Sequence, residues 1–315
     1  MRCLSKFGIG TLAVLLLGAS CATLPPAVRE VAPPERVGAM PRPLLKETSG
    51  LAPSHRAGDL LWAHNDSGDQ PVLYALGTDG RLRGKLRLFG ATNVDWEDLA
   101  SFESEGRAWL LVADVGDNAS QRTDCVLYVV PEPDPAALAP ERDLAADVAW
   151  RIPVRYPDGP RDCEAVAVDS REGLVYLVSK RTVPAVVYTL PLHPPPEGAA
   201  PTAQPVARLT QIPQPVKVQK SIAAPTGKYC AQPTGLDFSP DEATAALLTY
   251  GDVWLFHRDA GQTWTEAFAS EPQRLPPHGL MQAEAICFSR DGHALYVGTE
   301  GRRAPLLRYD LSRLR

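Results

Sequence analysis

Residues 164–190 read EAVAVDSREGLVYLVSKRTVPAVVYTL, and this stretch decides the fold of the chain. It opens at Glu164 with a short apolar run and continues with two runs rich in β-branched and aromatic residues, Leu174–Val178 and Val186–Leu190. Polar segments separate the runs. Short runs of this kind, divided by turn residues, are typical of antiparallel β-strands. The stretch therefore predicts a unit of three consecutive strands.

The same three runs occur five times along the chain. The copies start at Ser49, Glu97, Glu164, Thr234 and Glu284, at intervals of 48, 67, 70 and 50 residues. Strand repeats at this period are typical of a β-propeller, in which each repeat forms one four-stranded blade around a central channel. We therefore predict an all-β propeller with five blades. Six blades remain an alternative, because the two long intervals have room for further strands, whereas a two-sheet sandwich would not explain five matching copies.

The fourth strand of each blade is less regular in sequence. We expect it within Arg81–Phe89, Asp147–Val154, Pro205–Gln211 and Thr263–Ala269. Only seven residues follow Arg308, which is too few for a fourth strand in the last blade. We therefore expect Pro41–Glu47 to supply that strand, so that the two ends of the chain close the ring together.

The composition is that of a globular protein with an excess of proline. Of 315 residues, 44% are hydrophobic and 22% are charged, as in ordinary folded domains. The 31 prolines disfavour long helices, because an internal proline removes a hydrogen bond and clashes with the preceding turn. The net charge is −5 and no cluster of lysine and arginine occurs, so we expect no nucleic-acid partner. We expect the chain to be a monomer.

The first twenty residues have the pattern of a secretory signal. Arg2 and Lys6 precede a run of apolar and small residues over 7–20, shorter than the roughly 20 residues of a membrane span. The small residues directly before Cys21 resemble a bacterial lipobox. We therefore predict a signal peptide over 1–20 and a lipidated Cys21, with ordinary cleavage after Ala22 as the alternative. Ala22, where inner-membrane lipoproteins have Asp, favours the outer membrane or the cell surface.

A proline-rich segment follows the cysteine. Residues 22–45 contain six prolines, and such segments adopt extended conformations that act as spacers. We therefore predict three parts: the signal peptide over 1–20, the lipidated cysteine and its tether over 21–45, and the propeller over 46–315. The propeller would face the periplasm or the exterior, held to the membrane by its lipid.

The propeller topology gathers scattered polar residues at one end of the channel. The first strand of each blade starts at the same face that carries the loop between the second and third strands. We therefore expect two sets of residues to surround one mouth. The strand starts contribute Ser49, Glu97, Glu164, Thr234 and Glu284, and the loops contribute His64, Asn65, Asp66, Asp117, Asn118, Lys180 and Glu300.

Four carboxylates of this mouth are candidate metal ligands: Asp66, Glu97, Glu164 and Glu284. Several carboxylates cannot share a poorly solvated site without a cation, a shared proton or a salt bridge. Oxygen ligands in irregular geometry suit Ca²⁺ better than Mg²⁺. We therefore predict a divalent cation, Ca²⁺ before Mg²⁺. The alternative for each carboxylate is a turn cap or a hydrogen bond between blades.

Motifs for catalysis are scarce. The sequence has no Gly-x-Ser-x-Gly elbow, no His-Glu-x-x-His pair and no glycine-rich phosphate loop after a strand. His64 is the one histidine expected at the mouth, and it is our candidate general base. The alternative is a histidine whose hydrogen bonds are satisfied at a strand end.

Export also bears on the cysteines, because exported proteins often carry disulfides. Cys163 and Cys230 precede the first strands of neighbouring blades and are our candidate disulfide. We expect Cys125 and Cys287, which lie on different kinds of strand, to be free thiols.

Several short motifs resemble those of exported bacterial propellers: Ser49-Gly-Leu, His64-Asn-Asp-Ser-Gly-Asp, Asp95-Trp-Glu-Asp-Leu-Ala, Gly116-Asp-Asn, Arg161-Asp-Cys-Glu-Ala and Gln282-Ala-Glu-Ala. The chain is similar to the esterase-like-phytase and SdiA-regulated propellers, and more distantly to the calcium-dependent SMP-30 lactonases. The resemblance covers residues 46–315. It implies a divalent metal at the channel mouth and hydrolysis of ester, lactone or phosphoester bonds.

Two functional hypotheses follow. The first is a binding or scaffold module of the cell envelope that holds a cation and takes an unknown small-molecule or envelope ligand. The second is a metal-dependent hydrolase. Complete repeats beside missing catalytic motifs favour the first hypothesis, and the family resemblance favours the second.

Overall fold

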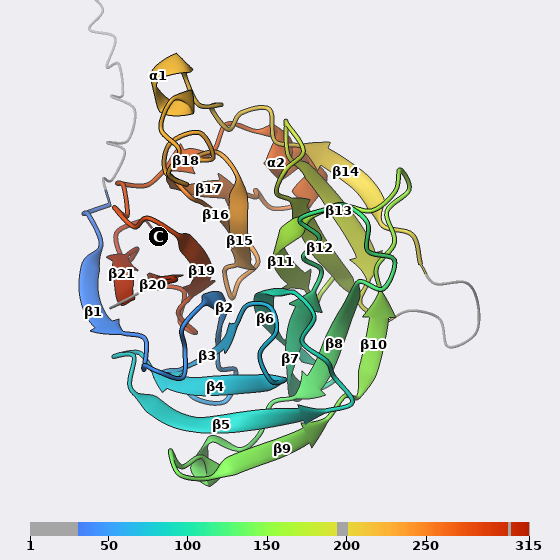
Figure 1. Cartoon of the computed structure of the whole chain (residues 1–315), viewed down its shortest axis with the longest axis vertical. Coiled ribbons are helices and arrows are strands. Elements are labelled where there is room, and N and C mark those ends of the chain that lie inside the picture. The colour runs from blue at the N-terminus through green and yellow to red at the C-terminus, as the bar shows by residue number, and fades with distance from the viewer. Residues whose placement is uncertain (1–30, 194–200, 302–303, 315) are drawn as a thin grey trace, which may run out of the picture.

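Five antiparallel sheets form a closed ring around a central channel (Figure 1). The computed structural model describes residues 31–193, 201–301 and 304–314. The predicted five-bladed propeller is confirmed, and six blades are excluded for these residues. The predicted signal peptide and Cys21 lie outside the described residues.

Each blade contains four strands in order from the channel outward, and the first three strands of each blade follow one another in the chain. Blade 1 holds β2 (Thr48–Pro53), β3 (Leu60–Asn65), β4 (Val72–Gly77) and β5 (Leu82–Phe89); blade 2 holds β6 (Trp96–Ser104), β7 (Arg107–Asp114), β8 (Val126–Pro131) and β10 (Trp150–Pro153); blade 3 holds β11 (Cys163–Asp169), β12 (Leu174–Ser179), β13 (Val186–Pro191) and β14 (Gln204–Arg208). Blade 4 holds β15 (Pro233–Phe238), β16 (Thr244–Thr249), β17 (Val253–His257) and β18 (Gln273–Arg274); blade 5 holds β19 (Ala283–Phe288), β20 (Ala294–Thr299), β21 (Pro305–Asp310) and β1 (Glu35–Ala39).

The ring closes through both ends of the chain, but not with the expected segment. Glu35–Ala39 forms β1 and pairs with β21, so the prediction of a strand at Pro41–Glu47 is wrong. Pro41 and Pro43 lack the N–H groups that a strand ladder needs, and the chain turns there, with Leu45 N donating to Pro41 O at 2.9 Å. The folded ring therefore begins about ten residues earlier than position 46, within the segment expected as a tether.

The fourth strand of blade 4 was also placed wrongly by the sequence. Thr263–Ala269 holds helix α2 (Trp264–Ala269), and the strand is β18. Thr263 caps the helix by accepting from Glu266 N, while the Glu266 carboxylate accepts from Thr263 N, a reciprocal pair that starts helices. Trp264 and Phe268 are buried against blades 3 and 4.

The long intervals in the repeat are explained by insertions. The interval before blade 3 contains η1 (Pro135–Ala137) and β9 (Asp143–Asp147), which adds a fifth strand to blade 1 parallel to β5. The interval before blade 4 contains α1 (Lys217–Lys220), which lies beyond β18 at the edge of the ring (Figure 1). Neither insertion forms another blade.

The hydrophobic core is divided into five clusters, one at each interface between neighbouring blades. Trp62 and Trp96 fill the interface of blades 1 and 2, for example, and both side chains are fully buried. All five clusters are formed by residues 31–311, so this part of the chain contains the packing that holds the ring. No helix among the described residues is long and apolar enough to cross a membrane.

Candidate functional site

The first strand of every blade carries a β-bulge at the same place, next to the channel mouth. The pairing register of β2, β6, β11, β15 and β19 shifts around one residue in each strand. A bulge leaves a residue out of the ladder and re-aims its side chain. The five bulged residues are those that the repeat predicted for the mouth: Ser49, Glu97, Glu164, Thr234 and Glu284.

These five side chains are buried, and two of them join neighbouring blades. Ser49 Oγ donates to Glu97 O at 2.8 Å, and Thr234 Oγ1 donates to Ala283 O at 2.7 Å. The hydroxyl groups of Ser49 and Thr234 thus form hydrogen bonds to the backbone of the next blade. The three glutamates bring negative charge to the same buried layer.

Three carboxylates from blades 1 and 2 converge on one side of the mouth. One carboxylate oxygen from each of Asp66, Asp95 and Glu97 lies within 4.8 Å of the other two. Asp95 and Glu97 are alternate residues at the start of β6, and Asp66 follows β3. Among the residues that the structure describes, no lysine or arginine forms an ion pair with any of the three. We call these three residues the acidic triad.

The backbone around the acidic triad is held by its own hydrogen bonds. The Asp114 carboxylate accepts from the N–H groups of Val94 and Asp95, at 3.3 and 3.1 Å, and pairs with Arg122 at 2.9 Å. Gly116 leaves room for the triad: a Cβ there would lie 2.2 Å from Glu97 Oε1 and 2.5 Å from Asp95 Oδ2.

The electrostatics of the acidic triad are unfavourable for three charged groups. Burial, together with the neighbouring Asp95 and Glu284 carboxylates, raises the pKa of Asp66 to about 7. Burial also raises the pKa of Asp95, and the nearby charge of Arg122 opposes this rise. Burial and the nearby Glu164 and Asp66 raise the pKa of Glu97 well above its usual range. At neutral pH the triad therefore needs a proton or a cation.

A second group of carboxylates, on the blade 3 side, has basic partners. Oxygens of Glu97, Asp162 and Glu164 also lie within 4.8 Å of one another. Lys180 forms an ion pair with Glu164, and Arg181 Nε pairs with Asp162 Oδ2 at 2.6 Å. This group is therefore largely compensated, which distinguishes it from the acidic triad.

Glu284 belongs to neither group. Its Oε1 accepts from Tyr250 OH at 2.6 Å, and the Tyr250 ring lies 5.0 Å from Lys180 Nζ. Glu300 lies beside it, and burial together with Glu284 raises the pKa of Glu300 to about 9. Of the four predicted ligands, the structure thus groups Asp66 with Glu97 and Glu97 with Glu164, but places Glu284 apart from both groups.

The structure does not bring His64 to the mouth. Its ring is fully buried between blades 1 and 2, packed edge-on against Trp96 with ring centroids 5.5 Å apart. Nδ1 lies 2.9 Å from Asn65 O, and burial lowers the pKa of the ring to about 4. The Nε2 atom is buried and has no hydrogen-bond partner among the described residues, so the ring also differs from the satisfied strand-end histidine that was the alternative to a general base.

Three loop candidates hold the backbone of the mouth. Asn65 donates to Leu44 O at 2.7 Å and accepts from Lys46 N at 2.9 Å, which ties the β3 end to the preceding loop. Asp117 accepts from the N–H groups of Gln121 and Arg122, at 2.8 and 2.9 Å. The third candidate, Asn118, accepts from the guanidinium of Arg181.

The candidate disulfide does not form: Cys163 and Cys230 are both free thiols, as are Cys125 and Cys287. Cys163 points into the core between blades 2 and 3, whereas Cys230 lies on the loop beside Gly251 of blade 4. Cys163 and Cys230 lie at or just before the first strands of neighbouring blades, as expected. Their side chains face different parts of the structure, so they do not meet.

Below the mouth, Asp98 crosses the channel. Its carboxylate accepts from Leu99 N at 2.8 Å in its own blade, from Val166 N at 2.7 Å in blade 3 and from Leu236 N at 3.1 Å in blade 4. The side chain is fully buried. Asp98 thus links three blades, a role that the strand repeat does not predict.

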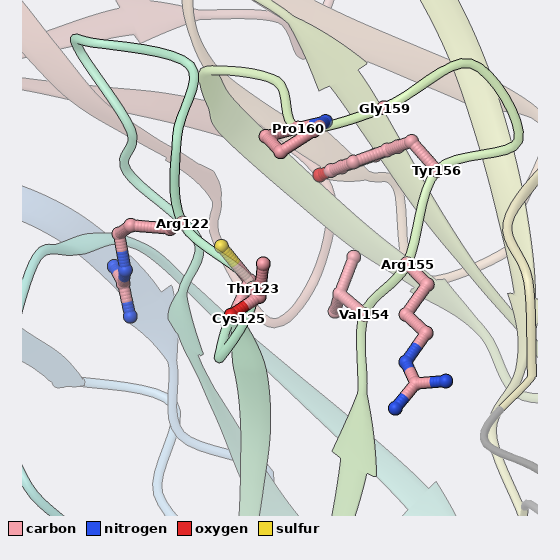
Figure 2. Close-up of a pocket in the computed structure, with 8 residues that line it drawn as sticks. All are labelled: Arg122, Thr123, Cys125, Val154, Arg155, Tyr156, Gly159 and Pro160. Atoms are coloured by element: carbon pink, nitrogen blue, oxygen red, sulfur yellow. The ribbon is translucent and has the colours of Figure 1, made fainter.

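A cavity of 280 Å³ lies between blades 2 and 3 on the mouth face. Figure 2 shows Arg122, Thr123 and Cys125 on one side of it and Val154, Arg155 and Tyr156 on the other. None of the mouth carboxylates lines this cavity. Arg122 connects the two features, because it also donates to Gly116 O at 2.8 Å, next to the acidic triad.

Comparison with known proteins finds solved structures of low similarity. No family model matches the sequence, and no curated protein matches it either. A Bacteroides uniformis protein named for 6-phosphogluconolactonase activity is 18% identical over 87% of this chain and 68% of its own, with a TM-score of 0.37. A gluconolactonase from Xanthomonas campestris is 13% identical over 89% of this chain and 95% of its own, with a TM-score of 0.44. Likeness at this level says nothing about activity.

Proposed function

We propose that the chain is a lipoprotein of the cell envelope whose propeller binds one divalent cation at the acidic triad and serves as a ligand-binding module. The observation that carries the proposal is the convergence of Asp66, Asp95 and Glu97, none of which forms an ion pair among the described residues. Buried charges without partners are costly, and a cation removes that cost. This set replaces Glu164 and Glu284 of the sequence-based set by Asp95.

The donor atoms of the triad fit a hard cation. All three are carboxylates, and Asn93 supplies an amide oxygen nearby, since its Nδ2 donates to Asp66 O at 2.8 Å. The Asn93 Oδ1 atom is buried and has no hydrogen-bond partner among the described residues. Oxygen donors in irregular array favour Ca²⁺, which takes six to eight, over Mg²⁺. Three or four protein oxygens would leave positions for water or for a ligand.

Thermal unfolding in chelator and in millimolar Ca²⁺ tests the cation. A ligand that binds only the folded state at a hundredfold excess over its dissociation constant stabilises by about 2.7 kcal/mol, and we expect a rise of several degrees. Asp95→Asn should lose the rise. Glu284→Gln, which removes a mouth carboxylate outside the triad, should keep it. Equal melting curves for the unaltered chain in both buffers would refute the cation.

The location in the envelope is proposed from the sequence: the signal pattern, Cys21 and the resemblance to exported bacterial propellers of the esterase-like-phytase and SdiA-regulated group. Stable anchoring needs more than one acyl chain, which a lipidated cysteine carries. Cys21→Ala should release the chain from the membrane fraction. Retention in that fraction after the substitution would contradict the lipid anchor.

A metal-dependent hydrolase is the second candidate, and one observation favours it. Glu97 belongs to both carboxylate groups, so the buried Lys180–Glu164 pair lies directly beside the proposed cation site. A bound divalent cation polarises a carbonyl or phosphoryl group and acidifies water. Glu164 would accept a proton from that water, and Lys180 would keep the carboxylate in position through their ion pair. Turnover of aryl esters, lactones or phosphoesters with Ca²⁺, abolished by Glu164→Gln in a folded chain, would establish this candidate.

A further inference from the structure

The large exposed hydrophobic side chains of the described residues lie on loops, links and strand ends of the mouth side. Seven large hydrophobic residues are exposed in the described part of the chain: Phe89, Val94, Val183, Val216, Val218, Ile222 and Met281. Each lies in a loop between the second and third strands of a blade, in a link between blades, or at the end of a fourth strand. These loops, links and strand ends lie on the mouth side of the blades, and Val218 lies in α1, at the edge of the ring (Figure 1). Exposed apolar residues that gather on one part of a surface mark an interaction site.

Five of these residues lie around the segment that links blades 3 and 4, and we call them the apolar rim: Val183, Val216, Val218, Ile222 and Met281. Val183 lines one cavity with Gln214 and Lys228, which connects the β12–β13 loop to this link. Thr226 Oγ1 lies 4.0 Å from Met281 Sδ, which connects the link to blade 5. The rim is therefore a continuous part of the surface.

Positive charge alternates with the apolar residues of the rim. Residues 213–228 read PQPVKVQKSIAAPTGK, with three lysines and no acidic residue, so the link carries a charge of +3. Lys217, Lys220 and Lys228 are exposed and form no ion pair among the described residues. The acidic mouth and this basic link thus occupy different sectors of the same face.

We propose that the apolar rim and its lysines dock the propeller, mouth face first, onto an anionic lipid surface. Exposed apolar side chains interleaved with lysine are the chemistry of segments that settle among the headgroups of a membrane. A protein partner is a poorer match, because lysine is depleted in the cores of protein interfaces. The proposal depends neither on the cation nor on lipidation of Cys21.

The course of the chain does not by itself set the orientation. Strand β1 runs toward the mouth, because Ala39 pairs with Pro305 at the start of β21 and Glu35 pairs with Arg308 farther along that strand. The described chain therefore enters β1 from the side away from the mouth, and the proposal rests on the residues of the rim alone.

Vesicle flotation of residues 31–315, which contain all five blades and their core, tests the proposal. We expect the domain to float with phosphatidylcholine vesicles that contain phosphatidylglycerol, to float poorly with phosphatidylcholine alone, and to be released by high salt. Lys217→Gln and Lys220→Gln should each lower the partition coefficient roughly fivefold. Val218→Ser/Ile222→Ser should lower it at least about tenfold. Arg107→Gln, which removes an exposed charge at the opposite end of blade 2, should leave it unchanged.

Three results would overturn the proposal. The first is no flotation with either vesicle, and the second is equal flotation with both. The third is a domain that sediments as a dimer, becomes a monomer on Val218→Ser/Ile222→Ser, and does not bind vesicles, since the rim would then be a contact between copies of the chain. Asp95→Asn leaves the rim intact, so this variant should lose the response to Ca²⁺ but still float with the vesicles. The two proposals can therefore fail independently.

Discussion

Lys180 and Glu164 form a buried ion pair at the channel mouth, with only 7% and 3% of their side chains exposed. The pair joins the end of β12 to the bulged start of β11 in the same blade. Burial raises the pKa of Glu164 well above its usual range, and Lys180 is the main group that opposes this effect. The carboxylates on the blade 3 side of the mouth therefore have a basic partner within the protein, whereas those on the blade 1 and 2 side form no ion pair among the described residues.

Removal of the lysine should show this balance. Lys180→Met leaves a buried carboxylate without its partner, and we expect unfolding free energy at neutral pH to fall by about 3–5 kcal/mol. The double variant Lys180→Met/Glu164→Gln should recover much of the loss, because the stranded charge is gone. Urea denaturation measures both. A double variant no more stable than the single one would contradict a compensated pair.

The acidic triad predicts a particular pH dependence in chelator. The folded form of Asp66, with a pKa of about 7 against an ordinary 3.8, binds its proton to a higher pH than the unfolded chain does. Stability from this group is therefore full below pH 4 and is lost as the pH rises through 7. The raised pKa values of Asp95 and Glu97 act in the same direction.

Urea unfolding at several pH values, with and without Ca²⁺, measures this effect. We expect the unfolding free energy in chelator to fall between pH 5 and 8, and we expect Ca²⁺ to remove much of that fall. In the Asp66→Asn variant, the fall in chelator should be smaller. A chelated domain that becomes more stable across this range would show that the triad is not a strained cluster of charges.

Gly116 should be required for the cation but not for the fold. A methyl group at this position would contact Glu97 Oε1 and Asp95 Oδ2 at distances far below van der Waals contact. We expect Gly116→Ala to displace both carboxylates and to abolish the Ca²⁺-dependent rise in melting temperature. Gly58→Ala is the control, because a Cβ there meets nothing within 4 Å. Equal Ca²⁺ responses in the two variants would mean that the triad geometry is unimportant.

Asp98 should be among the most sensitive positions for stability. Asp98→Ala leaves three buried N–H groups in blades 2, 3 and 4 without an acceptor. Each such loss costs about 1–3 kcal/mol, so we expect a decrease of more than about 3 kcal/mol in the unfolding free energy. Asp98→Asn, which keeps one acceptor oxygen, should lose less. A neutral Asp98→Ala would contradict the cross-channel role.

The cysteines give a chemical check on the structure. Residues 31–315 should show four reactive thiols in denaturant without reductant, because all four cysteines are free. Before denaturation, the buried Cys125, Cys163 and Cys287 should react slowly, and burial raises the pKa of the Cys163 thiol further from neutrality. A count of two thiols instead of four would show that a disulfide is present after all.

The sequence predicted the repeat because every blade shows the same pattern of strand residues, and it identified the five mouth positions from their place in that pattern. It failed where a blade departs from the pattern: capping by Thr263 and Glu266 turned an expected strand into α2. Asp95 was missed although it lies two residues before Glu97, because its role depends on Asp66 from another blade. Side-chain direction also decided against His64 and the disulfide, and a strand repeat does not contain that information.

Calorimetric titration of residues 31–315 with Ca²⁺ tests the central claim most directly. We predict one binding site per chain, lost in Asp95→Asn and retained in Glu284→Gln, because the acidic triad gathers three carboxylates that form no ion pair among the described residues, whereas Glu284 accepts a hydrogen bond from Tyr250. Absence of binding by the unaltered domain, or binding that survives Asp95→Asn, would contradict the claim.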